Sequence, residues 1–284
     1  MRRLTFTNAK GEGIVFYKSP YLITKLEGIG EVEADAQTQS APYQDGATYI
    51  DTRLQPRSIS MEGEFTKLYN LEDIREHRSR MQRVLSPKLG LGRITLEFDG
   101  AVKEILAVVD GTPAFPDKQR SPIQSFLVNF LAPDPYWKDP EETSRALRAY
   151  QGGLTLPFTL PFELSVTGDT TTLDNQGDEP TPVQIDIQGP VTNPRITNKT
   201  TGQFIQMNQS ISADEILHLD TSPRAIRAEL YREGYAIRKV LGWRDPESDF
   251  WLLEPGENEI QFIADAGGNN AAVAVSWQNR YLGI

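Results

Sequence analysis

The stretch Gly92-Arg-Ile-Thr-Leu-Glu-Phe-Asp-Gly-Ala-Val-Lys-Glu-Ile-Leu-Ala-Val-Val109 decides the fold class of this chain. Two runs rich in apolar and β-branched residues, Gly92–Phe98 and Ala101–Val109, are separated by the dipeptide Asp99-Gly100. An Asp-Gly pair between two such runs favours a two-residue turn whose twist matches that of antiparallel strands. The stretch therefore predicts a β-hairpin.

The sequence around this hairpin has the same strand character. Arg57–Phe65 alternates through Ile59, Met61 and Gly63, as a half-buried strand does. The largely apolar run 125–131 suits a strand that is buried on both faces.

Residues 34–48 differ from these runs, because they are polar and contain the turn signal Asp45-Gly46. A long loop and an extended hairpin arm both fit this composition. Connections of this length in compact domains are usually functional or bind a partner.

One helix is predicted over residues 71–85, with Asn70 as N-cap and Pro87 as the residue that stops it. Leu71, Ile74, Met81 and Leu85 share a face that Arg78 interrupts. The other side carries basic or imidazole side chains, which are Arg75, His77, Arg78, Arg80 and Arg83. They form either a solvated face balanced by Glu72 and Glu76 or a rim that meets an acidic neighbour.

Proline-rich residues 133–140 mark a boundary between two domains, and residues 141–148 fit a short helix before Gly152-Gly153. We expect a first domain over 1–137, a linker over 138–160 and a second domain over 161–284. The second half carries short strand candidates separated by turn residues, a spacing typical of a β-sandwich. These candidates are 170–174, 183–187, 195–198, 204–208, 215–220, 228–231, 250–253, 258–264 and 271–277.

Composition excludes several classes of protein. The chain has no cysteine, so disulfides, thiol nucleophiles and cysteine-bound zinc are excluded. The net charge is −10, and residues 141–284 carry most of it, so stable binding of nucleic acid is not expected. No apolar segment follows the two N-terminal arginines and no run approaches a membrane span, so we expect neither secretion by a signal peptide nor membrane insertion.

The residues that carry most enzyme chemistry are sparse. Only two histidines are present, His77 and His218, and neither has a second imidazole nearby in sequence. We therefore predict no catalytic site, no metal site and no cofactor. The segment 174–179 has its glycine at the wrong position for a calcium loop and is interpreted as a turn. Among the tryptophans, Trp251 and Trp277 lie in strand-like runs and suit the core, which leaves Trp243 as the one candidate for contact with a ligand.

The order of these features resembles the siphophage distal tail protein (Dit) family over essentially the whole chain. In the first half the resemblance rests on the polar arm with Asp45-Gly46, on Arg57-Ser-Ile-Ser-Met-Glu-Gly-Glu64 and on Phe130-Leu-Ala-Pro-Asp-Pro-Tyr-Trp137. In the second half it rests on Asn175-Gln-Gly-Asp-Glu-Pro-Thr-Pro182, Leu253-Glu-Pro-Gly-Glu-Asn-Glu-Ile260 and Arg280-Tyr-Leu-Gly-Ile284.

The resemblance implies a mainly β chain. Its first domain is a β-sandwich-like ring domain with one α-helix and hairpins, and its second is a sandwich like that of galectins or carbohydrate-binding modules. It also implies a structural virion protein that forms a homohexameric ring at the distal end of a non-contractile phage tail. Such a ring is assembled in the host cytoplasm, joins the tail tube protein to the tail-tip hub protein and leaves a channel through which DNA passes.

We predict that the arm contacts a neighbouring subunit, because exposed aromatic side chains dominate the energetics of interfaces. The predicted interface residues are Tyr43, Asp45, Gly46, Tyr49 and Leu54. The alternative is a lectin-like protein that binds carbohydrate through the second domain, with Trp243 as a contact.

Overall fold

The structure is a computed structural model that describes residues 2–66, 71–116, 124–148, 170–268 and 271–284. The chain divides into two compact units, one made of Met1–Pro140 with Tyr281–Ile284 and the other of Glu141–Arg280. Two features differ from the division expected from the sequence: residues 281–284 belong with the first unit, and a strand of the second unit lies in the expected linker.

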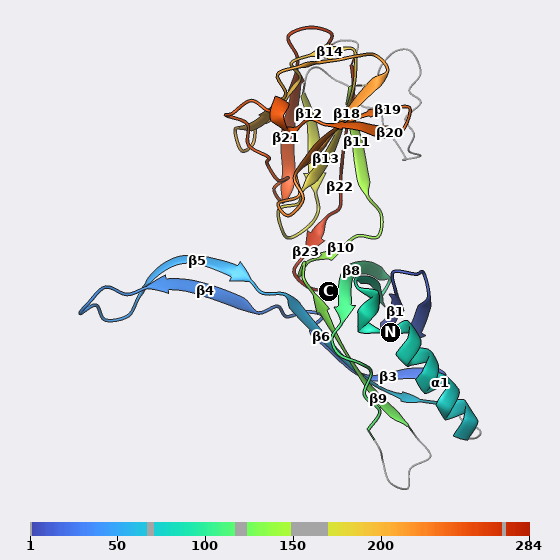
Figure 1. Cartoon of the computed structure of the whole chain (residues 1–284). Helices are drawn as coiled ribbons and strands as arrows, with labels where there is room; N and C mark the ends of the chain where they lie inside the picture. The colour runs from blue at the N-terminus through green and yellow to red at the C-terminus, as the bar shows by residue number, and fades with distance from the viewer. Residues whose placement is uncertain (1, 67–70, 117–123, 149–169, 269–270) are drawn as a thin grey trace. The chain divides into compact units, whose positions relative to one another are not determined.

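The first unit is built on a sheet of antiparallel strands in the order β2-β1-β7-β8-β9-β6-β3 (Figure 1). The strands of this sheet are β1 Arg2–Thr7, β2 Gly13–Phe16, β3 Tyr21–Glu27, β6 Arg57–Phe65, β7 Gly92–Phe98, β8 Ala101–Val109 and β9 Ser125–Ala132. The short strand β10 Trp137–Lys138 pairs with β8 and with the last strand, β23 Arg280–Tyr281. Strands β4 Ala34–Gln39 and β5 Thr48–Leu54 form a separate two-stranded sheet.

The sheet of the first unit closes on itself. Its two edge strands, β2 and β3, follow one another in the chain and meet through a bridge between Tyr17 and Leu22. One hydrophobic core fills the interior, and its aromatic members include Phe6, Phe126 and Phe130, each about 1 % exposed. The alternating strand β6 points Ile59 and Met61 into this core, as its sequence predicts.

The Asp-Gly hairpin is confirmed. Phe98 pairs with Ala101 across the turn, and the two turn residues Asp99 and Gly100 have φ angles of 47° and 91°. Two consecutive positive φ angles define the turn type that Asp-Gly favours.

The helix is also present, as α1 Leu71–Val84, and a short 3₁₀ helix, η1 Pro87–Leu89, follows it. Met81 is buried, but Leu71 is 74 % exposed, so its place on the apolar face was wrongly predicted. His77 was predicted on the polar side, yet its ring packs against Tyr21 and Phe65 and its Nδ1 lies 3.2 Å from the Tyr21 hydroxyl. The predicted N-cap, Asn70, lies outside the described residues.

The end of the chain is anchored in the first unit. The Tyr281 hydroxyl donates to Asp139 Oδ2 at 3.0 Å, and Lys103 Nζ lies 3.3 Å from the centre of the Tyr281 ring. Tyr281 and Ile284 pack against the core of this unit.

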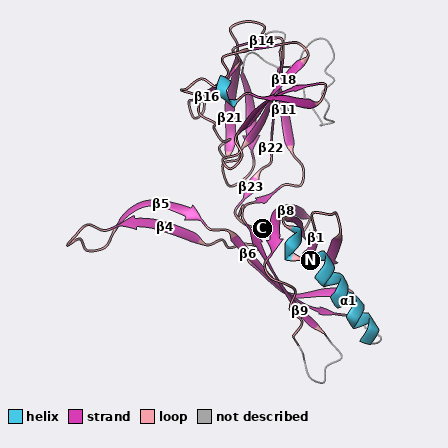
Figure 2. Ribbon diagram, viewed as in Figure 1, coloured by secondary structure: helices cyan, strands magenta, loops and turns pink. Residues whose placement is uncertain are grey.

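The second unit has a sheet in the order β11-β22-β13-β18-β19-β20 and a second sheet in the order β12-β21-β15-β16 (Figure 2). The first sheet is built from β11 Thr143–Arg148, β13 Val183–Gln188, β18 Glu215–Asp220, β19 Arg227–Arg232, β20 Tyr235–Lys239 and β22 Ala272–Trp277. The second is built from β12 Thr170–Asn175, β15 Arg195–Asn198, β16 Gln203–Gln206 and β21 Gly256–Ile263. Smaller elements are β14 Val191–Thr192, β17 Ser210–Ile211 and the 3₁₀ helix η2 Leu241–Trp243.

The two sheets share one core, so the predicted sandwich is confirmed. Ile185 and Leu217 enter this core from the first sheet, and Ile196 and Phe262 enter it from the second. No helix in the described part of the chain is long and apolar enough to cross a bilayer.

Two local predictions in the second unit were wrong, and one strand of its larger sheet was not predicted. Residues 143–148 form the edge strand β11 instead of a helix, because pairing with β22 supplies their backbone hydrogen bonds. Residues 250–253 make only an isolated bridge at Leu253, although Trp251 is buried in the core. Strand β20 was missed because its residues are all exposed and show no alternation.

Candidate functional site

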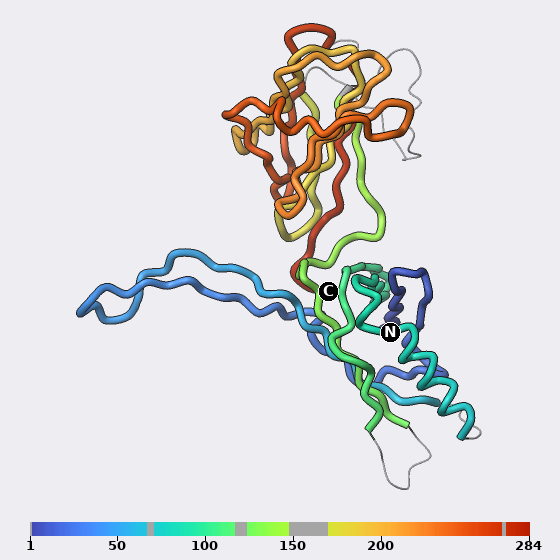
Figure 3. The backbone as a smooth tube through the Cα atoms, viewed as in Figure 1, coloured from blue at the N-terminus to red at the C-terminus, as the bar shows by residue number. Residues whose placement is uncertain are grey.

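The most exposed part of the first unit is the hairpin of β4 and β5, which we call the arm (residues 34–54). Of the two forms that the sequence left open, the structure has the extended hairpin. Ala34 pairs with Leu54 at one end and Gln39 pairs with Thr48 at the other, and Ile50 is the extra residue of a bulge. The backbone trace of the arm runs away from the sheet of its own unit (Figure 3).

The arm has no hydrophobic face of its own. Every residue from 33 to 53 is exposed, including Tyr43 at 108 %, Tyr49 at 61 % and Ile50 at 59 %. A two-stranded hairpin with both faces in water is marginally stable on its own. The arm therefore has the character of a segment that a partner covers.

The tip of the arm is an ordered turn. Ser40 Oγ donates to the Gly46 carbonyl at 3.1 Å, and the Ala41 amide donates to Gln44 Oε1 at 3.0 Å. Tyr43 has a φ of 64°, a left-handed conformation that is strained for an aromatic residue. These contacts hold the Tyr43 side chain out into solvent.

The root of the arm is fixed by a buried cation, Arg57, whose side chain is 1 % exposed. Its Nε donates to the Pro135 carbonyl at 2.7 Å, and its Nη1 donates to the carbonyls of Gly28 at 3.0 Å and Glu31 at 2.7 Å. Its Nη2 donates to the Leu282 carbonyl. Burial lowers the pKa of Arg57, and the negative charge of Glu31 partly opposes that effect.

The chain before the arm is held equally firmly. The indole Nε1 of the fully buried Trp137 donates to the Ile29 carbonyl at 3.0 Å. Gly28 has a φ of 81°, and a side chain there would overlap the Ser58 carbonyl. Arg57 thus joins the segment that enters the arm, residues 28–31, to the segment that leaves it.

The predicted interface residues all lie on the arm, but the structure does not bring them into one cluster. Tyr43, Asp45 and Gly46 lie at the tip. Tyr49 lies along β5, where its hydroxyl donates to Thr52 Oγ1 at 2.9 Å, and Leu54 is half-buried at the root opposite Ala34. Their role in an interface stays a prediction.

Sequence reasoning missed the two other residues that define the arm. Ile50 is exposed beside Tyr49, and its unpaired position in the bulge had no signal in the sequence. The sequence did indicate that Arg57 is buried, because it lies two and four residues before Ile59 and Met61 and so points to the same, inward side of β6.

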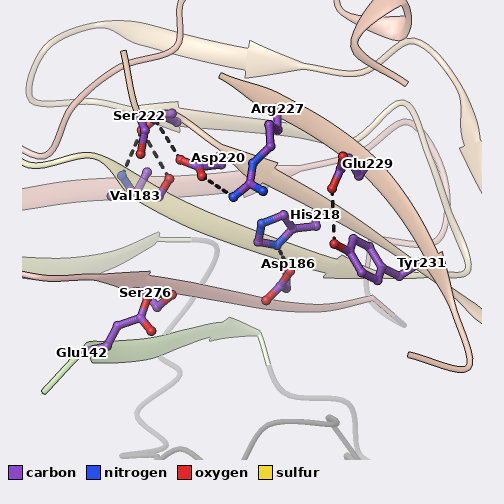
Figure 4. Close-up of polar contacts among 11 residues, drawn as sticks. Glu142, Val183, Asp186, His218, Asp220, Ser222, Arg227, Glu229, Tyr231 and Ser276 are labelled. Atoms are coloured by element: carbon purple, nitrogen blue, oxygen red, sulfur yellow. Dashed lines mark hydrogen bonds and ion pairs between the residues drawn. The ribbon is translucent and has the colours of Figure 1, made fainter. Parts of the chain in front are cut away.

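The second unit carries a polar cluster on the outer face of its larger sheet (Figure 4). Asp186, His218 and Glu229 are paired positions on β13, β18 and β19. His218 Nδ1 lies 2.7 Å from Asp186 Oδ1, and the Tyr231 hydroxyl donates to Glu229 Oε2 at 3.2 Å.

Neighbouring groups in this cluster are also paired with one another. Arg227 Nη2 lies 2.8 Å from Asp220 Oδ2, and the Asp220 pKa is lowered because hydrogen bonds from Ser222 and Arg227 outweigh the effect of burial. Within the described residues the cluster satisfies itself, so it has the character of a structural network across three strands.

The remaining predicted features take structural roles. Trp243 packs against the core of the second unit and Arg238 lies 5.9 Å from its ring centre, so packing accounts for this residue without a ligand. Sugar stacking on Trp243 stays a prediction. The segment 174–179 is a turn in which the Asn175 side chain donates to the carbonyls of Glu179 and Leu253, each at 3.0 Å. No group of three potential metal ligands occurs among the described residues.

Two protein-family models match the chain. The model described as phage tail protein RIFT-related domain matches residues 10–132, and the model described as siphovirus-type tail component, C-terminal domain, matches residues 176–281. No curated protein sequence matches the chain.

Solved structures share the fold. The Dit protein of phage SPP1, described as a paradigm of the hub adsorption apparatus in phages that infect Gram-positive bacteria, is similar with a TM-score of 0.71 and 14 % identity. That match covers 98 % of this chain and 99 % of the SPP1 chain. A chain from the baseplate of phage P2 in its activated conformation with calcium is similar over 100 % of both chains, with a TM-score of 0.55 and 10 % identity.

The root of the arm yields one prediction. Replacing Arg57 with Met keeps the aliphatic stem but removes the donors to four carbonyls, two of them in buried hydrogen bonds, so we expect the first unit to lose about 2–5 kcal/mol of stability. Hydrogen exchange of the amides of β3 and β6 during denaturant titration measures this unit separately from the other. The exposed Arg53→Met is the matched control and should change stability by less than about 0.5 kcal/mol. Equal stability of the two variants would contradict the structural role of Arg57.

The polar cluster yields a prediction about pH. Burial alone would lower the pKa of His218, but the hydrogen bond and negative charge of Asp186 outweigh it and raise the pKa. A raised pKa contributes stability below the unfolded value of about 6.5, and this contribution is lost as pH rises through the folded value. The stability advantage of the wild type over His218→Gln should therefore be larger near pH 5.5 than near pH 8.5, as measured by urea unfolding. In an Asp186→Asn background, the stability advantage of His218 over Gln should not be larger near pH 5.5 than near pH 8.5. If the wild-type advantage is the same at both pH values, the ion pair between Asp186 and His218 does not contribute to stability.

Proposed function

Because the chain belongs to the siphophage distal tail protein (Dit) family, whose members are structural components of phage tails, we propose that it assembles into a homohexameric ring at the distal end of a non-contractile tail. The ring joins the tail tube protein to the tail-tip hub protein and leaves a channel through which DNA passes. The first unit forms the ring, and the second unit contributes a galectin-like sandwich. The protein acts by assembly, at the virion tail tip, after the ring forms in the host cytoplasm.

The observation that carries this proposal is the arm. It exposes Tyr43, Tyr49 and Ile50 on a two-stranded hairpin that has no core of its own. A buried guanidinium and a buried indole nevertheless fix its root to the body of the first unit. An ordered root and an ordered tip on an uncovered hairpin support a contact with another subunit.

Ring formation follows from the kind of contact that an arm makes. The surface that reaches out is the arm, and the surface that receives it is a different part of the neighbouring copy. Such heterologous contacts close into rings when the rotation between subunits divides a full turn.

The charge of the chain supports the proposed channel. Residues 1–140, which make up most of the first unit, contain 18 lysines and arginines against 19 aspartates and glutamates, so the proposed ring has no surplus of basic groups with which to hold phosphates. DNA can then move through the ring without being retained.

Shortening the arm tests the proposal. Ala36 and Thr52 are paired across the hairpin, so residues 37–51 can be replaced by Asn-Gly, which closes the two strands with a tight turn. We expect the full-length chain to form hexamers that appear as six-fold rings with a central hole in negative-stain micrographs. The shortened chain should be monomeric by light scattering at the same concentration, because it has lost the exposed aromatic anchors.

A matched pair of point variants sharpens this test. Tyr43→Ser removes an exposed tyrosine from the arm, whereas Tyr235→Ser removes one that is 77 % exposed on β20 of the second unit. Tyr43→Ser should weaken the hexamer and Tyr235→Ser should not. A hexamer that persists without residues 37–51 would show that the arm does not hold the ring together.

A further inference from the structure

A pocket of about 520 Å³ opens on the first unit at the edge formed by β1, β2 and the start of β3. It is within the size range of ligand-binding pockets. Its charged lining residues are Arg3, Lys18, Arg80 and Glu97, and its other lining residues include Val15 and Tyr17.

The pocket carries excess positive charge. Glu97 is already engaged by Arg3, with Nη1 and Oε1 3.1 Å apart. Lys18 lies 4.9 Å from the centre of the Tyr17 ring, and Arg80 Nη2 donates only weakly to the Gly13 carbonyl, at 3.4 Å. No carboxylate pairs with Lys18 or Arg80 in the described parts of the chain. Two cations beside an exposed apolar residue, Val15 at 41 %, fit an acidic segment that also carries an apolar side chain.

The tip of the arm has this chemistry. Asp45 makes no ion pair with any described residue, and Tyr43 stands two residues away from it with its side chain fully exposed. The arm as a whole, residues 34–54, contains three aspartates against one arginine, Arg53. The charges of the pocket and of the arm are therefore complementary.

The pocket and the arm lie at opposite ends of β3, and the arm runs away from the sheet of its own unit, so its tip does not fill the pocket of its own chain (Figure 3). Tyr21, at the start of β3, lines the pocket, while Gly28 follows the end of β3 and enters the arm root. Residues 34–43 span about 30 Å at the rise of a β-strand, and a unit of this size has a radius of gyration of about 14 Å. The arm is therefore long enough to reach over most of a neighbouring first unit.

We propose that the pocket of one copy receives the arm tip of the next copy. Asp45 pairs with Lys18 and Arg80, and Tyr43 packs on Val15 and Tyr17. This inference rests on the proposed ring and specifies its contact. It also assigns a binding role to Arg80, one of the basic residues of α1, whereas Arg78 stacks on Phe115 and Arg83 pairs with Glu12 within the same unit.

Charge exchange tests the contact. Arg80→Glu and Asp45→Arg should each raise the subunit concentration at half assembly by roughly tenfold, because each turns an attraction into a repulsion at every interface. The double variant Asp45→Arg/Arg80→Glu should restore assembly close to that of the wild type. Arg75→Glu makes the same charge change on an exposed position of α1 outside the pocket, so it should leave assembly unchanged and should fail to rescue Asp45→Arg.

Mass photometry over a series of dilutions, at about 50 mM and about 500 mM salt, provides the measurement, since screening should weaken a contact between exposed charges. The inference is overturned if Arg80→Glu behaves as Arg75→Glu does, or if the double variant is no better than Asp45→Arg alone. Loss of assembly on shortening the arm, together with indifference to Arg80→Glu, would leave the proposed ring intact and place the docking surface elsewhere. Assembly that persists without the arm would defeat the proposed role of the arm itself.

Discussion

Arg57 is the residue on which the geometry of the first unit depends. Its guanidinium group is buried, no carboxylate of the described residues pairs with it, and its donors are satisfied by carbonyls of Gly28, Glu31, Pro135 and Leu282. A buried cation is costly unless its hydrogen bonds are made, so the four carbonyls must all be delivered to the same place. Those carbonyls belong to three separate segments of the chain, and the requirement therefore fixes the arm root, the end of the first unit and the returning chain terminus together.

Because its root is fixed, the exposure of the arm is informative about how it could bind a partner. A polar hairpin attached through a flexible loop would be an ordinary surface loop. Here Trp137 and Arg57 hold both ends of the hairpin, and side-chain hydrogen bonds order the turn that presents Tyr43. A hairpin whose root and turn are held by these contacts loses less conformational entropy when a partner binds, which lowers the cost of binding. In the proposed ring, the arm is thus partly preorganised for contact with the next copy.

The sequence predicted the local structure well wherever turn chemistry or alternation decided it. Asp99-Gly100 predicted a hairpin, and the alternation of residues along β6 predicted which of them enter the core. The helix predicted over residues 141–148 is absent, because hydrogen bonding to the edge of β22 outweighs the local helix propensity of residues 143–148. Of the candidate site, the arm was visible as a polar segment with a turn signal. The pocket was not, because its cations come from β1, the β2–β3 connection and α1, which only the closed sheet brings together.

The number of subunits in a head-to-tail ring is an angular quantity. Each copy is rotated by the same angle relative to the one before it, and the ring closes only if that angle divides a full turn. The angle depends on the direction of the arm relative to the receiving surface of the same copy. In this chain that direction is set at the root, where Gly28 allows the backbone to turn and Arg57 locks it to residues 135 and 282. A contact at the tip can supply affinity, but it cannot correct an error of angle accumulated over several copies. In the proposed ring, the buried cation at the root would therefore contribute to the angle between copies even though it lies at the other end of the arm from the tip.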